Sequence, residues 1–175
     1  MNVLELSSLG WHLIAMQKGS KNPGSLVGEA WQTKATSDAT TIKTWADLGL
    51  NFGVLLGPSS GVIDVEYDSD EGEAILANAA PTLSYKSAKS LHRIYKWDSR
   101  FEHERANFGH KGTEWRFGQN KAQSVIPPSI HESGAQYEWV DLLPVAELPA
   151  EMWELFQTLK AEKEHTTARE RPVSI

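Results

Sequence analysis

Cysteine is absent from the 175 residues of this chain. Disulfides and thiolate metal sites are therefore excluded, and any metal ion must be held by oxygen or imidazole ligands. No apolar run approaches the roughly 20 residues that span a bilayer, and the N-terminal segment lacks the basic stretch and apolar core of a signal peptide. These absences predict a cytoplasmic protein with no membrane association.

The chain also lacks an excess of positive charge. It carries 17 Lys and Arg against 23 Asp and Glu, which gives a net charge of −6. Phosphate neutralisation by basic side chains supplies most non-specific affinity for nucleic acid, so the isolated chain is expected to bind DNA weakly. A polymerase is still compatible with this charge, because such enzymes gather acids around metal ions and keep basic residues in one groove.

Repeats and low-complexity segments are missing as well, and the composition is that of an ordinary globular protein, with 40% hydrophobic and 23% charged residues. The length suits one domain. Strand and helix signals alternate along the chain, which predicts an α+β fold with a mixed or antiparallel sheet and flanking helices. We expect the domain to occupy residues 1–163 and residues 164–175 to form a disordered tail.

The hydrophobic patterns also predict individual elements. The expected strands are 11–16, 51–57, 61–66, 83–86, 91–97, 113–117, 122–126 and 137–140. The expected helices are a short one near the N-terminus, then 38–48, 68–80 and 149–163. The strands at 51–57 and 61–66 are predicted to form a hairpin around a Pro-Ser-Ser-Gly turn, and 98–112 is predicted to be a loop.

Two acids stand in one of the apolar strands. Asp64 and Glu66 alternate with Ile63 and Val65, and residues two apart in a strand point to the same face. Neighbouring carboxylates raise each other's pKa unless a cation neutralises them, and hard ions such as Mg²⁺ and Mn²⁺ prefer oxygen ligands. The pair therefore indicates a divalent-metal site, with a solvated strand face as the alternative.

The acids that follow this strand do not form a calcium-binding loop. Such a loop needs glycine at its sixth position, and counted from Glu66 that position is Glu71. Acidic side chains are favourable at the start of a helix. We therefore interpret them as the first turn of the helix predicted at 68–80.

A histidine begins the strand predicted at 91–97. His92 follows a polar turn that includes Lys89 and Ser90, and these groups together would suit phosphate oxygens. The alternative is an ordinary surface turn with a histidine.

Two further segments carry polar residues in a binding pattern. Glu114 and Arg116 share one face of a strand, so they form either an ion pair or a metal ligand beside an arginine that contacts a triphosphate. Ser129 and His131 follow a double proline, which makes the loop rigid, and rigid loops with polar residues often bind ligands.

The order of these features resembles a known family. Over roughly residues 10–140 the chain is similar to the bifunctional primase–polymerase N-terminal domain, a branch of the archaeo-eukaryotic primase superfamily found in plasmids, phages and other mobile elements. The features that carry the resemblance, in order, are Lys21, Pro23 and Trp31, then Ala35-Thr36, the acids Asp64 and Glu66, His92, Glu114 before Arg116, and the segment PPSIHESGAQYEW.

The resemblance implies a catalytic core like that of RNA-recognition motifs and a two-metal mechanism of nucleotidyl transfer. Asp64, Glu66 and Glu114 would hold two Mg²⁺ or Mn²⁺ ions, which activate the primer 3′-hydroxyl and neutralise the departing pyrophosphate. The nucleotide-binding residues would be His92, Arg116, Ser90, Lys89, Ser129 and His131. One departure concerns the turn before the histidine, where the family has Ser-Gly-Gly-x-His and this chain has Ala88-Lys89-Ser90-Leu91-His92.

The expected function is that of a DNA polymerase, with primase activity left open, which takes nucleoside triphosphates on a single-stranded or primed DNA template. Because the sequence ends soon after the domain, we expect a helicase or accessory domain to be supplied in trans. The loss of the two glycines favours a catalytically weak module that binds nucleotide or template. Paired acids would also fit a metal-dependent nuclease, although that leaves the His92 and Arg116 strands unexplained.

Overall fold

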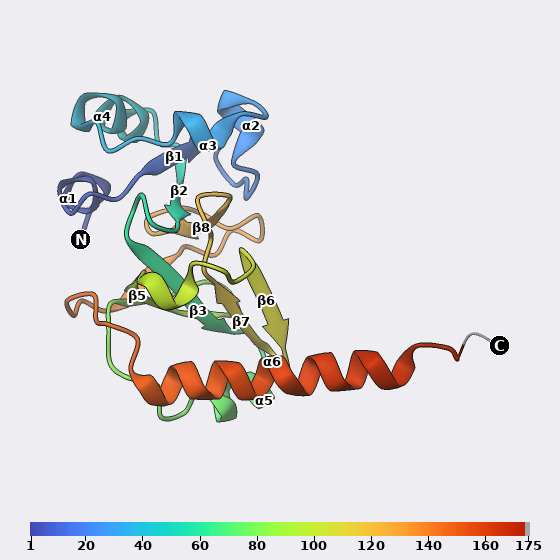
Figure 1. Ribbon diagram of the computed structural model, residues 1–175. Helices are drawn as coiled ribbons and strands as arrows, with labels where there is room; N and C mark the ends of the chain where they lie inside the picture. The colour runs from blue at the N-terminus through green and yellow to red at the C-terminus, as the bar shows by residue number, and fades with distance from the viewer. Residues whose placement is uncertain (174–175) are drawn as a thin grey trace.

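Two antiparallel sheets lie face to face at the centre of the computed structural model, which describes residues 1–173 (Figure 1). The strands are β1 (Leu13–Met16), β2 (Asn51–Leu56), β3 (Val62–Tyr67), β4 (Ser84–Lys86), β5 (Leu91–Lys96), β6 (Asn107–His110), β7 (Thr113–Arg116), β8 (Ala122–Ile126) and β9 (Glu138–Asp141). The α-helices are α1 (Val3–Ser8), α2 (Gly24–Val27), α3 (Trp31–Lys34), α4 (Ala39–Asp47), α5 (Asp70–Ile75) and α6 (Ala150–Glu170). The predicted α+β class is confirmed.

The sheets differ in size and in what covers them. The small sheet has the order β1-β2-β8, and the large sheet has the order β6-β7-β3-β5-β4-β9. Figure 1 shows α1 to α4 gathered beside the small sheet, while α6 runs along the opposite side of the large one. The layers are therefore helices, small sheet, large sheet and α6.

Each layer boundary is filled by buried apolar side chains. Between the two sheets, Val62 and Ile94 from the large sheet pack with Phe52 and Val54 from the small one. On the other side of the large sheet, α6 covers residues such as Val65 with an aromatic cluster. Strand β3 is therefore covered on both faces.

The structure corrects the predicted hairpin. Strand β2 pairs with β1 and β8, whereas β3 pairs with β5 and β7, so the two strands belong to different sheets. Only one bridge, between Gly57 and Val62, joins the segments at the turn. The prediction failed because two apolar runs joined by a short turn fit a hairpin and a crossing between stacked sheets equally well.

Two other boundaries differ from the prediction. The segment 98–112, predicted to be a loop, contains a 3₁₀ turn at Ser99–Phe101 and strand β6. Helix α6 continues to Glu170, so residues 164–170 are helical and not a disordered tail; of that predicted tail, residues 174–175 lie outside the described part. No helix within residues 1–173 is long and apolar enough to cross a membrane.

Candidate active site

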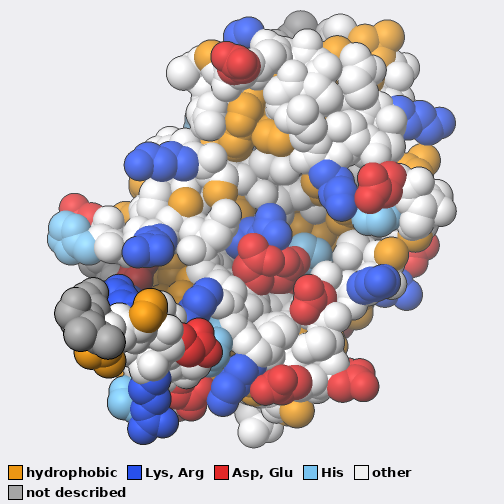
Figure 2. All heavy atoms as spheres, turned by 90° about the vertical axis from the view of Figure 1, so that its right-hand side faces the viewer, with side chains coloured by type: hydrophobic (Ala, Val, Ile, Leu, Met, Phe, Trp, Pro, Cys, Tyr) orange, Lys and Arg blue, Asp and Glu red, His pale blue; other side chains and the backbone are white. Residues whose placement is uncertain are grey.

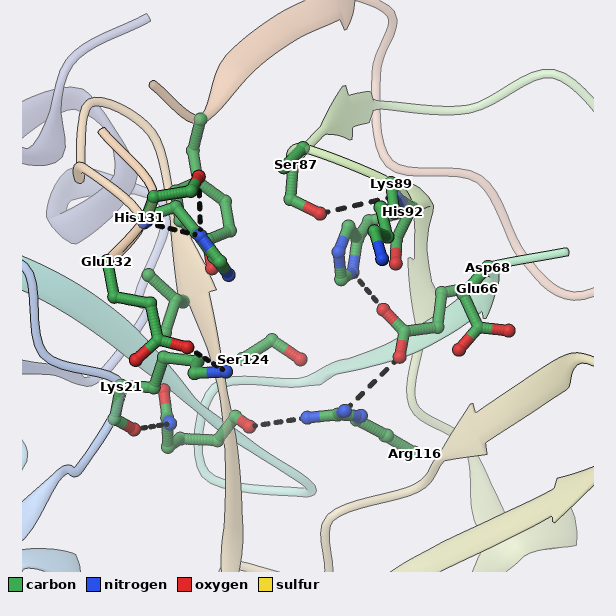
Figure 3. Close-up of a pocket in the computed structure, with 16 residues that line it drawn as sticks. Lys21, Glu66, Asp68, Ser87, Lys89, His92, Arg116, Ser124, His131 and Glu132 are labelled. Carbon is green, nitrogen blue, oxygen red and sulfur yellow. Dashed lines mark hydrogen bonds and ion pairs between the residues drawn. The ribbon is translucent and has the colours of Figure 1, made fainter. Parts of the chain in front are cut away.

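A pocket of about 850 Å³ opens where the two sheets part. Figure 2 shows acidic, basic and histidine side chains gathered around a hollow on this face of the molecule. In the close-up of Figure 3, His92 and Arg116 both point toward Glu66, and His131, Glu132 and Lys21 lie on the opposite wall. The pocket is therefore lined with charged groups of both signs.

The register of the large sheet places Glu66 at the centre of this cluster. Glu66 pairs with His92 of β5 on one side and with Glu114 of β7 on the other, so all three side chains share one face. Asp64 precedes them on the same face and pairs with Arg116 across the β3–β7 ladder. The strand order thus brings together residues separated by up to 52 positions in the chain.

The acids of β3 are buried, which excludes the solvated strand face. Asp64 is 0% exposed and Glu66 is 6% exposed, because the small sheet covers this face of β3. Buried carboxylates require compensating charge or hydrogen bonds. His92, Ser124 and Arg116 provide them here.

His92 joins the two acids. Its Nδ1 lies 2.8 Å from Asp64 Oδ2 and 2.8 Å from Glu66 Oε2, and its ring stacks on Tyr85 with the centroids 4.4 Å apart. Burial alone would lower the pKa of His92, but the two carboxylates raise it to about 10. The imidazole is therefore protonated at neutral pH and offsets one negative charge of the pair.

The same three residues form a set suited to a divalent cation. Ligand atoms of Asp64, Glu66 and His92 lie within 4.8 Å of one another. Asp64 Oδ2 accepts a hydrogen bond from Ser124 Oγ at 2.6 Å, whereas the buried Oδ1 has no hydrogen-bond partner among the described residues. The carboxylate oxygens suit Mg²⁺ or Mn²⁺, and the imidazole could join them as a ligand once it has given up its proton to solvent. The residues present therefore fit a metal ion.

Glu114, the third predicted metal ligand, contacts an arginine. Arg116 Nη2 lies 3.2 Å from Glu66 Oε1 and 3.2 Å from Glu114 Oε2, and Nη1 donates to the carbonyl oxygen of Gln123 at 3.2 Å. Burial and the neighbouring Glu66 raise the pKa of Glu114, and Arg116 opposes that shift. Glu114 and Arg116 thus form the ion pair that was one of the two predicted alternatives, and Arg116 lines the pocket.

The turn before His92 lines the pocket without glycine. Ser87 and Ser90 close it through a backbone bond of 3.0 Å and a bond of 3.3 Å from the Ser90 amide to the Ser87 hydroxyl. No residue of this turn has a positive φ, so the backbone there does not require glycine. Lys89 and Ser90 therefore present side chains to the pocket.

The double-proline loop contributes only part of what was predicted. His131 lines the pocket, and its Nδ1 lies 2.9 Å from Ser133 Oγ. Ser129 does not reach the pocket, because its hydroxyl bonds both backbone groups of Phe52, accepting from N at 2.8 Å and donating to O at 3.1 Å. The Ser129 hydroxyl therefore supports the backbone of β2, and this position argues against contact with a nucleotide.

Sequence reasoning missed several residues of the pocket. Ser124 bonds Asp64, Tyr85 supports His92, and Tyr137 lines the wall beside His131. Ser124 is the buried polar residue of β8, between Gln123 and the apolar Val125, and a serine directly before an apolar pair was its only signal. From the sequence alone, Tyr85 and Tyr137 are indistinguishable from ordinary aromatic residues of the hydrophobic core.

One known protein family matches most of the chain. The family model for the bifunctional DNA primase/polymerase N-terminal domain matches residues 3–151. No curated protein matches the chain significantly. The match covers most of the chain and implies primase or polymerase chemistry on nucleotide and DNA substrates, with dependence on a metal ion. The chain belongs to the bifunctional DNA primase/polymerase N-terminal domain family.

Proposed function

We propose that this protein catalyses template-directed nucleotidyl transfer, as a DNA polymerase and a candidate primase, at the pocket between the sheets. The observation that carries the proposal is the buried set of Asp64, Glu66 and His92. One oxygen of Asp64 has no hydrogen-bond partner within residues 1–173, and Glu66 and His92 line a pocket that also holds cationic side chains. Acids alone would suit several metal enzymes. The cationic groups that also line the pocket, such as Lys89, support a triphosphate substrate.

The chemistry assigned to the residues follows from their positions. Asp64, Glu66 and His92 would hold Mg²⁺ or Mn²⁺, which supplies Lewis-acid polarisation of the reacting oxygens. Lys89 and Arg116 line the pocket as cations and would neutralise the triphosphate. In the reaction the primer 3′-oxygen bonds to the α-phosphorus, the bond to pyrophosphate breaks, and the hydroxyl proton passes to solvent.

The substrates would be nucleoside triphosphates and a single-stranded or primed DNA template. We infer a two-ion arrangement, as the family resemblance implies, with one ion on the set named above. A helicase or accessory domain is the proposed partner that would unwind the template. The proposed setting is the replication of a plasmid, phage or other mobile element.

The test is primer extension with labelled deoxynucleotides and Mg²⁺ or Mn²⁺. We expect extension by the wild-type protein and a loss of about a hundredfold or more in Asp64→Asn and Glu66→Gln, because the metal contributes several kcal/mol. Asp47→Asn is the matched control, because this acid forms only an exposed pair with Lys43 on α4.

Other outcomes identify the alternatives. Triphosphate binding by calorimetry without extension would favour the binding module. A primer that becomes shorter in a manner lost with Asp64→Asn would indicate a nuclease. Extension at wild-type rates in both acid variants would refute the proposed site.

A further inference from the structure

Strand β6 continues the pocket-side face of the large sheet beyond Arg116. Asn107 pairs with Arg116 and Gly109 pairs with Glu114 in the β6–β7 ladder, and residues paired across antiparallel strands point to the same face. Asn107 and Gly109 are both exposed, so this part of the face is open to solvent, whereas the acids of β3 are buried. The two residues form a strip from the pocket to the edge of the sheet, which we call the β6 shelf.

The shelf has room for a ligand that lies across it. Gly109 carries no side chain, and a Cβ atom at this position would meet one neighbouring atom within 4 Å, the carbonyl oxygen of Thr113 at 3.8 Å. The φ angle of Gly109 is not in the left-handed region, so the backbone does not require glycine here. The surface between the pocket and the sheet edge is therefore low and unobstructed.

Cations gather where the shelf ends. Strand β6 is the outer strand of the large sheet, and α6 passes its end (Figure 1). A cavity of about 300 Å³ at this edge is lined by Asn107 of the shelf and by Arg105, Lys160 and Lys163. Lys163 Nζ bonds the carbonyl oxygen of Gly109, so the cations of α6 lie directly beside the shelf. We call Arg105, Lys160 and Lys163 the cationic edge.

The cationic edge keeps an excess of positive charge. Its three cations share the cavity with two carboxylates, those of Glu104 and Glu164. Lys160 Nζ lies 3.1 Å from Glu104 Oε2, whereas the exposed side chain of Arg105 has no ion-pair partner within residues 1–173. In a chain with a net charge of −6, a local excess of cations indicates an anionic ligand.

Two roles fit cations at the edge of a sheet. Charged side chains protect an edge strand from pairing with other chains, and this role requires nothing of the pocket. The other role is to bind a chain of phosphates. The shelf favours this second role, because it joins the edge to Arg116 in the pocket, and DNA carries phosphates all along its length. A free nucleotide would occupy the pocket alone.

We propose that a DNA strand runs from the active pocket across the β6 shelf and that its phosphates bind the cationic edge. Because the contacts are to phosphate, binding at this edge is independent of base sequence. The inference rests on the proposed function, which puts the DNA substrate in the pocket.

The test measures the binding of a fluorescently labelled primed template by anisotropy over a range of salt concentrations. We expect the double variant Arg105→Gln/Lys163→Gln to bind about tenfold or more weakly at about 50 mM salt, because two charged contacts are lost. The slope of log K against log salt concentration should become shallower by about 2, which is about 1 for each phosphate contact. Nucleotide affinity, measured by calorimetry, should not change.

A matched double variant removes the same charge elsewhere. Lys43 pairs with Asp47 on α4, and Lys96 is exposed in a separate pocket beside Leu142. Lys43→Gln/Lys96→Gln should bind the primed template within about twofold of the wild-type protein, because salt screens distant charges. Equal losses in the two double variants would show that net charge alone controls binding, and the inference would be wrong.

A second pair of variants tests the shelf itself. Gly109→Glu and Gly109→Gln place side chains of the same size on the shelf and differ only in charge, and the room around Gly109 admits both. We expect Gly109→Glu to bind the primed template about fivefold or more weakly than Gly109→Gln, because its carboxylate repels the DNA phosphates. Equal affinities would overturn the path across the shelf.

Folding is checked by circular dichroism. If the double variant at the cationic edge does not fold, Arg105→Gln alone decides, because this exposed side chain has no ion pair to lose within the part of the chain that the structure describes. A lower stability with unchanged DNA affinity would assign the cations to edge protection and refute the inference.

Failure of the proposed function gives a different result. DNA binding that weakens in Arg105→Gln/Lys163→Gln and in Gly109→Glu, without primer extension by the wild-type protein, would refute the polymerase and leave the DNA path standing. Primer extension by the wild-type protein with no effect of these variants on DNA affinity would refute the path alone.

Discussion

The two faces of strand β3 carry the same alternating backbone but opposite contents. One face presents Ile63 and Val65 to an aromatic cluster under α6. The other presents Asp64 and Glu66 to the side covered by the small sheet, where Glu66 lines the pocket. Both faces are buried, so burial alone does not distinguish them. What differs is the covering layer, which is a helix on one side and a second sheet with polar residues on the other.

Within β3, one face therefore contributes to the stability of the fold and the other carries the candidate site. The α6 face removes apolar area from water and leaves no charged group behind, which stabilises the fold. The pocket face buries carboxylates, which costs free energy unless cations and hydrogen-bond donors compensate them. The apolar packing under α6 therefore stabilises the fold enough to offset the free energy that the buried carboxylates cost on the pocket side.

The sharpest test of this separation removes the centre of the apolar face. Phe156 of α6 is fully buried and has ring centroids of Trp115, Phe117 and Trp153 at 5.4, 5.0 and 5.2 Å. Phe156→Ala should lower the free energy of unfolding by about 3–5 kcal/mol, measured by urea denaturation. Mn²⁺ affinity at low temperature should remain that of the wild-type protein.

Phe156→Leu serves as the milder variant if the alanine protein does not fold. A large loss of Mn²⁺ affinity in folded Phe156→Leu would show that the two faces are coupled, against the comparison drawn above.

A smaller effect is expected from the covering sheet on the pocket face. Ser124→Ala removes the 2.6 Å hydrogen bond to Asp64 Oδ2 and leaves the metal ligands themselves in place. Because such partners orient the ligands, Mn²⁺ affinity should fall by about 10- to 100-fold, measured by calorimetry. Unchanged affinity would mean that the small sheet merely covers the acids.

The smallest effect is predicted for the other buried serine near the pocket. Ser129→Ala leaves the N–H and C=O groups of Phe52 without their partner, so we expect a loss of about 1 kcal/mol or more in unfolding free energy. Deoxynucleotide and Mn²⁺ affinity should not change, whereas Ser124→Ala is expected to weaken Mn²⁺ binding. A loss of nucleotide affinity at constant stability would restore the binding role predicted from the sequence.

The elements with clear periodic patterns were predictable from the sequence. Strand β8 was predicted with its observed bounds. Helix α4 lies within the predicted range 38–48 and begins after Asp38, whose carboxylate accepts from the Thr41 amide at 2.9 Å. The α+β class followed from the same patterns, whereas the family was indicated by the resemblance of an ordered set of motifs, including PPSIHESGAQYEW. Strand partners did not, because the β2 and β3 runs carry no mark of the sheet to which each belongs.

The site was predictable in its residues and less so in its contacts. The alternation around Asp64 and Glu66 predicted that both carboxylates share a face, and the ladders to β5 and β7 bring His92 and Glu114 beside Glu66. The sequence assigned His92 to phosphates, whereas its Nδ1 lies against both acids. Such contacts depend on register across three strands, which local patterns do not encode.

By itself, the sequence determined the strand that carries the acids, the face they share and the exclusion of sulfur ligands. Only the tertiary structure decided that this face is buried under a second sheet, that Arg116 lies between Glu66 and Glu114, and that Ser129 supports β2. The physical reason is the distance along the chain over which each property is determined. Side-chain alternation is a local property of the backbone, whereas burial and ion pairing arise from segments brought together by the packing of two sheets.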